Sequence, residues 1–266
     1  MDKIGIIGIG NMGEAIVKTL LKNGVKKESI LCSEIKPERV IQIENMYNVK
    51  FVEKIEEMIK KVTYIILSIK PQDSKTLLLK IAPLIDDKKV IISIMAGVTI
   101  SNILSAIGKP VKIVRIMPNI CVKVGEGAIG ITSNSVIERK EFEAVEELFS
   151  PLGKTIEVGE ESMDAVTALG GSGPAFFLLF LEAMIDAGVK MGITREKSKT
   201  ISTQVIKGTL KMLEEEKIHP TVMREMVTSP AGTTIAGLAV LEEKAFRGNI
   251  IKAIEKSMKR ARELSL

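Results

Sequence analysis

The sequence contains few aromatic residues and few cysteines, and these shortages exclude several classes of protein. Aromatic residues make up 3% of the 266 positions, and tryptophan is absent. The core must therefore consist of Ile, Leu, Val, Met and Ala, and few rings are available to stack on single-stranded nucleic acid. Cys32 and Cys121 are too few for a disulfide framework or a metal cluster. We expect both to be buried free thiols, as is usual in a reducing cytoplasm.

The chain has one histidine, His219, which lies directly before Pro220. A Ser-His-Asp triad would have to use this residue, and no G-x-S-x-G elbow accompanies it. His, Cys and carboxylate residues also do not cluster at metal-ligand spacing, so we expect no metal. The remaining explanation is catalysis by positioning and electrostatics, with the difficult chemistry left to a cofactor.

Charges of both signs are mixed along the chain. The 38 Lys and Arg residues against 33 Asp and Glu residues give a net charge of +5, and no run of five like charges occurs. This pattern is typical of a solvated surface, so we expect no nucleic-acid partner. Glycines interrupt the first apolar run, and polar residues interrupt the uncharged stretch 90–108. We therefore expect neither a signal peptide nor a membrane span, and we predict a cytoplasmic protein.

The pattern changes near residue 159, which predicts two domains, 1–159 and 160–266. In the first, short apolar runs rich in Ile and Val alternate with helical stretches, as in a doubly wound parallel sheet of the Rossmann type. The predicted strands are 3–7, 30–33, 64–68, 90–94, 111–116, 127–132 and 155–158. The predicted helices between them are 12–22, 37–47, 72–81, 100–107 and 140–149.

The second domain has no strong strand pattern. Helices are predicted at 174–191, 195–216, 220–226, 233–241 and 246–264. The first of these helices is apolar on nearly every face, which is typical of a helix buried in a core or an interface. Because helices this apolar would make a poor isolated bundle, we predict an all-α dimerisation domain.

A glycine motif, Gly8-Ile9-Gly10-Asn11-Met12-Gly13, follows the first predicted strand and opens the first helix. That context favours dinucleotide binding over a plain tight turn. Gly8 permits the turn, Gly10 lets the backbone approach a pyrophosphate, and Gly13 lets the helix pack closely on the strand. The helix N-terminus supplies free N–H donors to the phosphates.

The residues at the end of the second predicted strand are compatible with both NAD and NADP. Glu34 lies where an acidic residue accepts hydrogen bonds from the adenosine ribose, which favours NAD. Ser33, Lys36 and Arg39 lie beside it and could hold a 2′-phosphate, which favours NADP. Lys36 and Arg39 are equally well explained as a solvated helix face.

Polar residues also follow the later strands, at the edge of the sheet where ligands bind in open α/β folds. Lys70 is placed to meet a charged part of the cofactor or substrate, and Ala96 leaves room for a flat ring. Asn119 offers both a donor and an acceptor. The segments are Ser68-Ile69-Lys70-Pro71, Met95-Ala96-Gly97-Val98-Thr99 and Arg115-Ile116-Met117-Pro118-Asn119.

Two segments of the helical domain precede predicted helices. Leu169–Pro174 is glycine-rich and is predicted to expose N–H groups at a helix start. Ser229–Thr234 combines small residues, two threonines and a helix N-terminus, as in a cradle for a carboxylate. As an isolated feature, Thr233 or Thr234 is better explained as a helix N-cap.

Taken together, these motifs resemble the pyrroline-5-carboxylate reductase family over essentially the whole chain. The resemblance rests on Gly8–Gly13, Lys70-Pro71, Ala96–Thr99, Met117–Asn119, Gly171–Ala175, His219-Pro220 and Ser229–Ile235. It implies reduction of 1-pyrroline-5-carboxylate, a cyclic imino acid, to L-proline by NADPH or NADH in proline biosynthesis. It also implies an interlocked homodimer that often assembles further into a decamer, as a pentamer of dimers.

The resemblance also implies the site residues. The cofactor would be held by Ile7, Gly8, Ile9, Gly10, Asn11, Met12, Ser68, Ile69, Lys70 and Pro71, to which the strand-end analysis adds Ser33, Glu34, Ala96 and Asn119. The substrate would be held by Ser229, Gly232, Thr233 and Thr234, with Thr234 near the ring nitrogen as the catalytic residue.

Three positions depart from the family pattern. The family usually has Ser at Gly170, often has Asn near Ile55, and usually has Gly at Ala231. The last change is tolerable if that position needs no positive φ.

Other readings remain open. Another NAD(P)-dependent imine or β-hydroxyacid reductase shares this plan, although β-hydroxyacid dehydrogenases place a lysine on the first long helix, and here Lys190 lies at its far end. A non-catalytic cofactor sensor would need no Ser229–Thr234 cradle and would need an effector module, of which no sign is evident.

Overall fold

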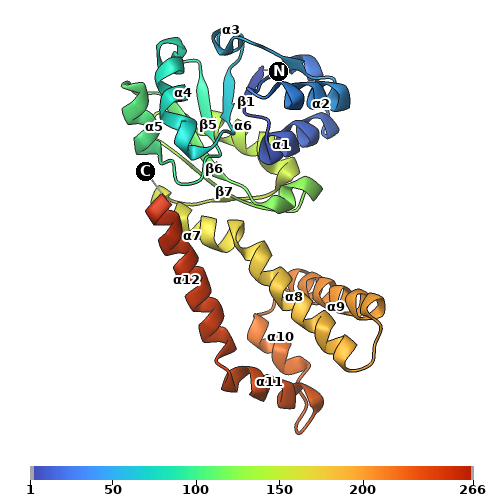
Figure 1. Cartoon of the computed structure of the whole chain (residues 1–266). Helices are drawn as coiled ribbons and strands as arrows, with labels where there is room; N and C mark the ends of the chain where they lie inside the picture. Colours follow the sequence, from blue (N-terminus) through green and yellow to red (C-terminus); the bar gives the residue numbers. More distant parts are fainter. Residues whose placement is uncertain (1–2, 265–266) are drawn as a thin grey trace. The chain divides into compact units, whose positions relative to one another are not determined.

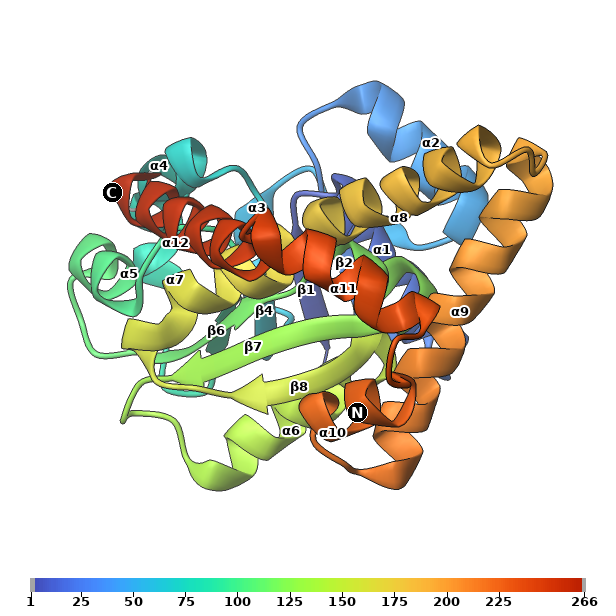
Figure 2. The ribbon, with the colours of Figure 1, turned by 90° about the horizontal axis from the view of Figure 1, so that it is seen from below.

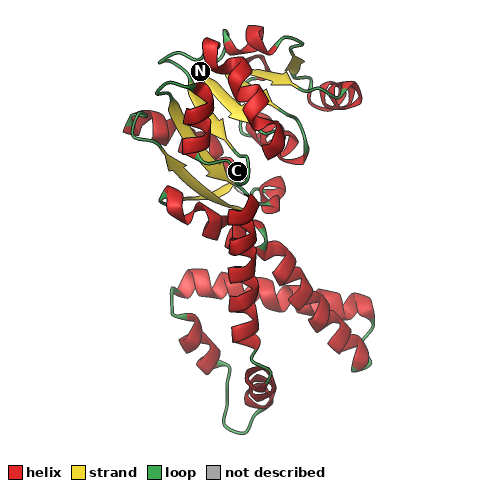
Figure 3. Cartoon of the chain, turned by 60° about the vertical axis from the view of Figure 1, so that its left-hand side comes forward, coloured by secondary structure: helices red, strands yellow, loops and turns green. Residues whose placement is uncertain are grey.

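A computed structural model describes residues 3–264 and shows an eight-stranded sheet with helices on both faces (Figures 1 and 3). The strands are β1 (Ile4–Ile7), β2 (Ile30–Ser33), β3 (Lys50–Phe51), β4 (Tyr64–Leu67), β5 (Val90–Ser93), β6 (Lys112–Met117), β7 (Gly127–Ser133) and β8 (Gly153–Glu157), in the order β3-β2-β1-β4-β5-β6-β7-β8. The seven predicted strands are found within two residues of their expected bounds. The doubly wound sheet is confirmed.

The sheet is not parallel throughout, which corrects the sequence prediction. β7 runs antiparallel to β6, with Ile116 opposite Ile131, while β8 returns parallel to β7 (Figure 2). The segment joining β6 to β7 is a short 3-10 turn, Ile120–Val124. A connection this short can reverse the chain but cannot make the crossover that a parallel neighbour requires.

Helices cover the sheet on two sides because each helix buries one apolar stripe. The helices packed on the sheet are α1 (Asn11–Lys22), α2 (Pro37–Tyr47), α3 (Ile55–Ile59), α4 (Ser74–Ile81), α5 (Ile100–Ile107) and α6 (Arg139–Phe149). The helices that follow along the chain are α7 (Met163–Val166), α8 (Gly173–Lys190), α9 (Arg195–Glu216), α10 (Pro220–Met226), α11 (Thr233–Glu243) and α12 (Phe246–Leu264). One core cluster contains residues of α1, α2 and α6, namely Ile16, Ile43 and Phe149. Met58 and Ile103 belong to the opposite cluster, with α3, α4 and α5.

The two cysteines are free, as expected, but only Cys32 is buried; Cys121 is half-buried. Burial, with a smaller contribution from the Glu44 carboxylate, raises the pKa of the Cys32 thiol to about 12. This thiol is therefore protonated and inert at neutral pH.

The described chain divides into two compact units. Residues 3–172 together with 257–264 form the first, and residues 173–256 form the second. Within the second unit, α8 and α9 pack closely at Gly188, where an added Cβ would collide with Ser198. The Ser198 hydroxyl donates to the Ile185 carbonyl at 2.8 Å. The other residues of α8 and α11 bury little surface within the described chain: Gly188 is the only buried residue of α8, and α11 has none.

The helical segment Glu160–Lys190 is long and apolar enough to cross a membrane by length and composition alone. Core and interface helices pass the same test, and only 6% of its most apolar window is buried within the chain. Its exposed face includes Leu178 and Leu179, at 58% and 68% exposure. This face needs a partner that the single chain does not supply.

The glycine-rich segment 169–174 does not lie at a free helix start, contrary to the prediction. The helix passes through it as a π-helical turn, Thr167–Gly171, and the Ser172 N–H donates to the Thr167 carbonyl at 3.1 Å. An intrahelical bond therefore uses the Ser172 N–H, which the sequence pattern predicted to be exposed. The Gly170 carbonyl also accepts a hydrogen bond from the Asn119 side chain at 3.1 Å.

Ala231 has a φ of +54°. The replacement of the family's glycine by alanine was expected to be tolerable only without a positive φ, so it is not harmless here. An L-residue in this left-handed region places its Cβ too close to the following carbonyl, at a cost of about 1–2 kcal/mol. Glycine escapes that cost but loses more backbone entropy on folding. The strain directly precedes α11 and its N-cap, Gly232.

We predict that Ala231→Gly raises the free energy of unfolding by up to about 1 kcal/mol, because relief of the strained φ outweighs the added chain entropy. Ala236→Gly is the matched control. This residue lies inside α11, where the same change lowers stability by about 1 kcal/mol. Urea denaturation measures both variants. Equal loss of stability in the two would show that position 231 carries no strain.

Candidate functional site

A pocket of about 980 Å³ opens where the strand order reverses, between β1 and β4. In open α/β sheets this switch point is where ligands bind. Its walls come from the loops after β1, β2 and β4 and from residues of α2, α3 and α4. The predicted cofactor residues that line it are Ile7, Gly8, Ile9, Gly10, Ser33, Glu34, Ser68, Ile69 and Lys70.

The three motif glycines meet different surroundings, and each agrees with its predicted role. Gly8 has a φ of +89°, and a Cβ there would lie 2.6 Å from the Ser68 carbonyl oxygen. A Cβ on Gly13 would collide with the Gly8 carbonyl. A Cβ on Gly10 would meet nothing within 4 Å, although Gly10 lines the pocket. Gly8 and Gly13 are therefore required by packing, whereas Gly10 leaves open space.

That open space adjoins the N-terminus of α1, which no side chain caps. The first amides of a helix lack intrahelical acceptors, and the helix dipole adds partial positive charge there. An uncapped helix start beside a roomy glycine suits a diphosphate. These residues fit a dinucleotide.

The Glu34 carboxylate is fixed by backbone amides. Its Oε2 accepts from the Ile9 N–H at 2.8 Å. Its Oε1 accepts from the N–H groups of Ile35 and Lys36 at 2.9 and 3.1 Å. The acidic side chain at the end of β2 thus lies in the pocket and is tied directly to the glycine loop.

The Arg39 guanidinium is already committed to partners within the protein. Its Nε donates to the Ile9 carbonyl at 2.8 Å, and its other nitrogens bond to Gln42 and to the Glu14 carboxylate. The Glu14 carboxylate also accepts from the Tyr47 hydroxyl at 3.0 Å. Although burial raises the pKa of the Glu14 carboxyl, the hydrogen bonds from Arg39 and Tyr47 outweigh it and hold that pKa below its ordinary value. Arg39 therefore supports the glycine loop. This contact argues against the explanation of Arg39 as part of a solvated helix face.

The other predicted cofactor residues do not line the pocket: Asn11, Met12, Pro71, Ala96 and Asn119. Ala96 is exposed, but the Asn119 amide is buried and occupied at both ends. Its oxygen accepts from the Cys121 N–H at 3.1 Å, and its nitrogen donates to the Gly170 carbonyl. Asn119 thus ties the end of β6 to the π-helical turn.

Several pocket residues were not singled out from the sequence. Thr76, Leu77 and Lys80 line it from one face of α4. Their spacing along the predicted helix, together with its start after the β4 end, is the signal that could have identified them. Ile55, where the family often has Asn, also lines the pocket and is buried.

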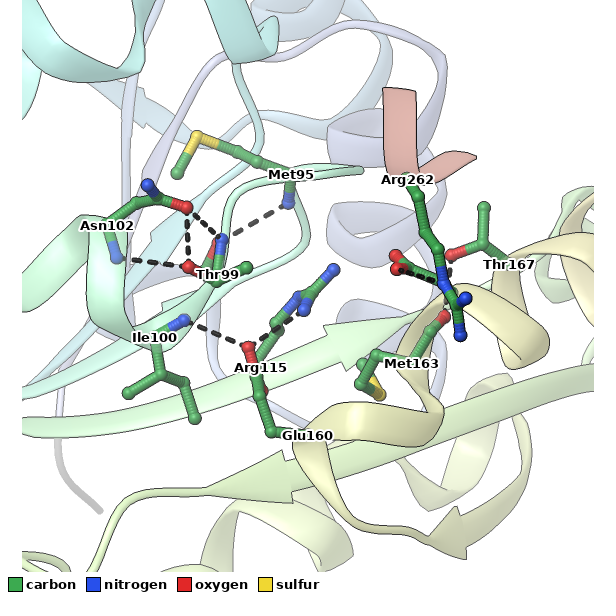
Figure 4. A network of polar contacts seen from close by, with 11 residues as sticks. Met95, Thr99, Ile100, Asn102, Arg115, Glu160, Met163, Thr167 and Arg262 are labelled. Carbon is green, nitrogen blue, oxygen red and sulfur yellow. Dashed lines mark hydrogen bonds and ion pairs between the residues drawn. The ribbon is translucent and has the colours of Figure 1, made fainter. Parts of the chain in front are cut away.

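A polar network lies near the loop after β5 (Figure 4). Arg115 on β6 is buried and bonds the Glu160 carboxylate at 2.8 Å. The same carboxylate accepts from the Ile100 N–H at 3.0 Å, at the start of α5. Thr99 and Asn102 form a capping box on that helix. The network fixes the 95–99 loop against the segment that follows β8.

In the second unit, the predicted substrate cradle is the start of α11. Gly232 is the N-cap, and no side chain caps this helix. The N-cap explanation of Thr233 and Thr234 is therefore wrong: both lie inside the first turn. A Cβ on Gly232 would collide with the Ser229 hydroxyl, so that hydroxyl lies directly against the turn. Thr234 is half-buried.

We predict opposite effects for two glycine substitutions in the loop. Gly10→Ala leaves stability within about 0.5 kcal/mol of the native chain, because its Cβ meets no protein atom. It weakens dinucleotide binding at least about tenfold, since the methyl group takes the space of the pyrophosphate. Gly13→Ala lowers stability by about 1–3 kcal/mol through overpacking. Urea denaturation and coenzyme titration measure the pair, and native affinity in Gly10→Ala would contradict the assignment.

Two family comparisons divide the chain. Residues 160–264 match the family described as pyrroline-5-carboxylate reductase dimerisation. Residues 3–97 match the family described as NADP oxidoreductase, coenzyme F420-dependent.

Relatives cover both parts at once. The pyrroline-5-carboxylate reductase of Aquifex aeolicus is 36% identical, over 98% of this chain and 97% of its own length. The structure of the Coxiella burnetii pyrroline-5-carboxylate reductase has a TM-score of 0.93 at 30% identity, over 100% of this chain and 99% of that one. The Plasmodium falciparum pyrroline carboxylate reductase, solved with NADP bound, has a TM-score of 0.89 at 30% identity, over 100% of this chain and 98% of that one. With both halves matched in one alignment, the chain belongs to the pyrroline-5-carboxylate reductase family.

Proposed function

We propose that this protein reduces 1-pyrroline-5-carboxylate to L-proline with NADPH or NADH, the last step of proline biosynthesis. The observation that carries the proposal is the full-length match to reductases of this name, which includes the dimerisation domain. The pocket at the β1–β4 switch point, with its uncapped helix start, supports the use of a dinucleotide.

The coenzyme supplies the hydride when it is bound. The residues of this chain that would hold it are the glycine loop, Glu34 and the segment Ser68–Pro71. Ile69, Ile55 and Leu77 give the pocket apolar surface for flat rings. A protonated imine already carries its proton, so the protein needs to bind and orient the substrate rather than supply a strong acid.

The start of α11 would perform that orientation. The Thr233 N–H would donate to the substrate carboxylate, because an uncapped helix N-terminus favours an anion. The Gly232 N–H closes the turn before it by donating to the Ser229 carbonyl at 3.1 Å. Ser229 would add a hydroxyl at the turn. Thr234 would bond the ring nitrogen through its Oγ and so fix which face of the imine is presented for reduction.

The chain is expected to act as a homodimer, because residues 160–264 match a dimerisation family and their apolar helices lack cover in one chain. We further propose that residues 1–159 form the dinucleotide domain, that residues 160–266 form the substrate domain, and that dimers assemble into a decamer. Two free thiols support a cytoplasmic location.

The function is tested by mixing the purified protein with 1-pyrroline-5-carboxylate and following the loss of reduced-nicotinamide absorbance. We expect oxidation of NADPH or NADH with formation of proline. Coenzyme binding without oxidation would reject this substrate and favour another imine or a keto acid.

We predict that Thr234→Ala lowers kcat at least about tenfold, because the imine is then no longer oriented for hydride transfer. Thr234→Ser restores most of the activity because it returns the hydroxyl. The circular dichroism spectrum and melting temperature of both variants should match the native protein. Full activity in Thr234→Ala would remove this residue from the mechanism.

A further inference from the structure

We propose that Glu34 makes this enzyme bind NADH in preference to NADPH. The inference rests on the proposed function, which leaves the coenzyme open between the two. The two coenzymes differ only in a phosphate on the 2′-oxygen of the adenosine ribose. The discriminating residues must therefore lie where that ribose binds, at the end of β2.

Glu34 lies at the end of β2, and three backbone hydrogen bonds hold its side chain there. Its carboxylate accepts N–H groups from Ile9, Ile35 and Lys36, all within 3.1 Å. A carboxylate accepts at about four lone-pair sites, so these bonds leave one site, on Oε2, for a ribose hydroxyl. A 2′-phosphate would instead place a second anion against a carboxylate that the backbone holds in position.

The nearest guanidinium does not offset this repulsion. Arg39 lines the same pocket, but its Nε and both terminal nitrogens are bonded to Ile9, Gln42 and Glu14. The Glu14 carboxylate neutralises its charge. Each terminal nitrogen keeps one further N–H, but the guanidinium would meet a phosphate with its charge already paired to Glu14 and its orientation fixed by the bond to the glycine loop.

The remaining charges on this side of the pocket do not reverse the balance. Glu38 and Glu53 line it together with Glu34, against the exposed side chain of Lys36. An exposed lysine is strongly hydrated and screened by salt, so it attracts a phosphate only weakly. Lys70, Asp73 and Lys80 line the wall formed by the β4–α4 loop and α4.

Direct binding tests the proposal independently of turnover. The chain has no tryptophan, so the fluorescence of the reduced nicotinamide itself is followed as NADH or NADPH is titrated. We expect the native dimer to bind NADH at least about tenfold more tightly than NADPH, as like-charge contact predicts. The ratio of kcat/KM with 1-pyrroline-5-carboxylate should follow the same order.

Glu34→Gln removes the charge and keeps an oxygen that can accept the Ile9 N–H. We expect it to tighten NADPH binding about tenfold and to leave NADH binding within about threefold, so that the preference largely disappears. Glu38→Gln is the matched control: it removes the same charge from the same pocket, four residues further along the chain. It should leave the NADH-to-NADPH ratio unchanged.

Three results would overturn the proposal. The first is native NADPH affinity equal to or greater than that for NADH. The second is an equal shift in Glu34→Gln and Glu38→Gln, which would show that total charge decides. The third is a selective loss of NADPH binding in Lys36→Ala, which would show that Lys36 holds the phosphate. Failure of the proposed function looks different: NADH binds with the expected preference, but 1-pyrroline-5-carboxylate is not reduced.

Discussion

The first unit depends on one close backbone approach. Between β1 and α1 the chain turns so tightly that the Gly8 backbone lies against Ser68 of the neighbouring strand and against Gly13 of the helix. No side chain fits at either glycine. Because the helix can come this close, its uncapped N-terminus opens directly onto the switch point between β1 and β4. The pocket, its phosphate-binding character and the position of Glu34 beside it all follow from this contact.

The second unit follows a different physical logic. Its helices bury little within their own chain: α8 has a single buried residue, Gly188, and α11 has none among the described residues. In a soluble protein such apolar surface is stabilised by a second copy, which agrees with the dimerisation family that this region matches. The predicted substrate cradle lies on α11. Under the proposed function, substrate binding and dimer formation would use the same poorly covered helices, and the single chain would be an incomplete enzyme.

Local patterns predicted the elements well, and they failed where a long-range contact decided the outcome. Runs of Ile and Val identified the strands, but a short turn at Ile120–Val124 reversed β7, which no periodicity reveals. The glycines before Pro174 indicated a helix start, yet the preceding helix continues through them as a π-helical turn. The bonds at both ends of the Asn119 amide join residues far apart in the sequence or depend on the local turn, so its position did not reveal them, and its cofactor role stays a prediction. Ala231 required knowledge of its φ, which sequence does not give.

The loop after β2 also shows why coenzyme preference and loop geometry are coupled. The Ile9 peptide is held from both sides: its N–H donates to Glu34, and its carbonyl accepts from Arg39. Replacing Glu34 by a small residue would admit a phosphate but would leave the Ile9 N–H without this acceptor. Turning the Arg39 guanidinium toward that phosphate would release the carbonyl and unpair Glu14 as well. A change of coenzyme in this fold therefore requires a residue at position 34 that loses the negative charge and still offers the Ile9 N–H an acceptor, as glutamine does.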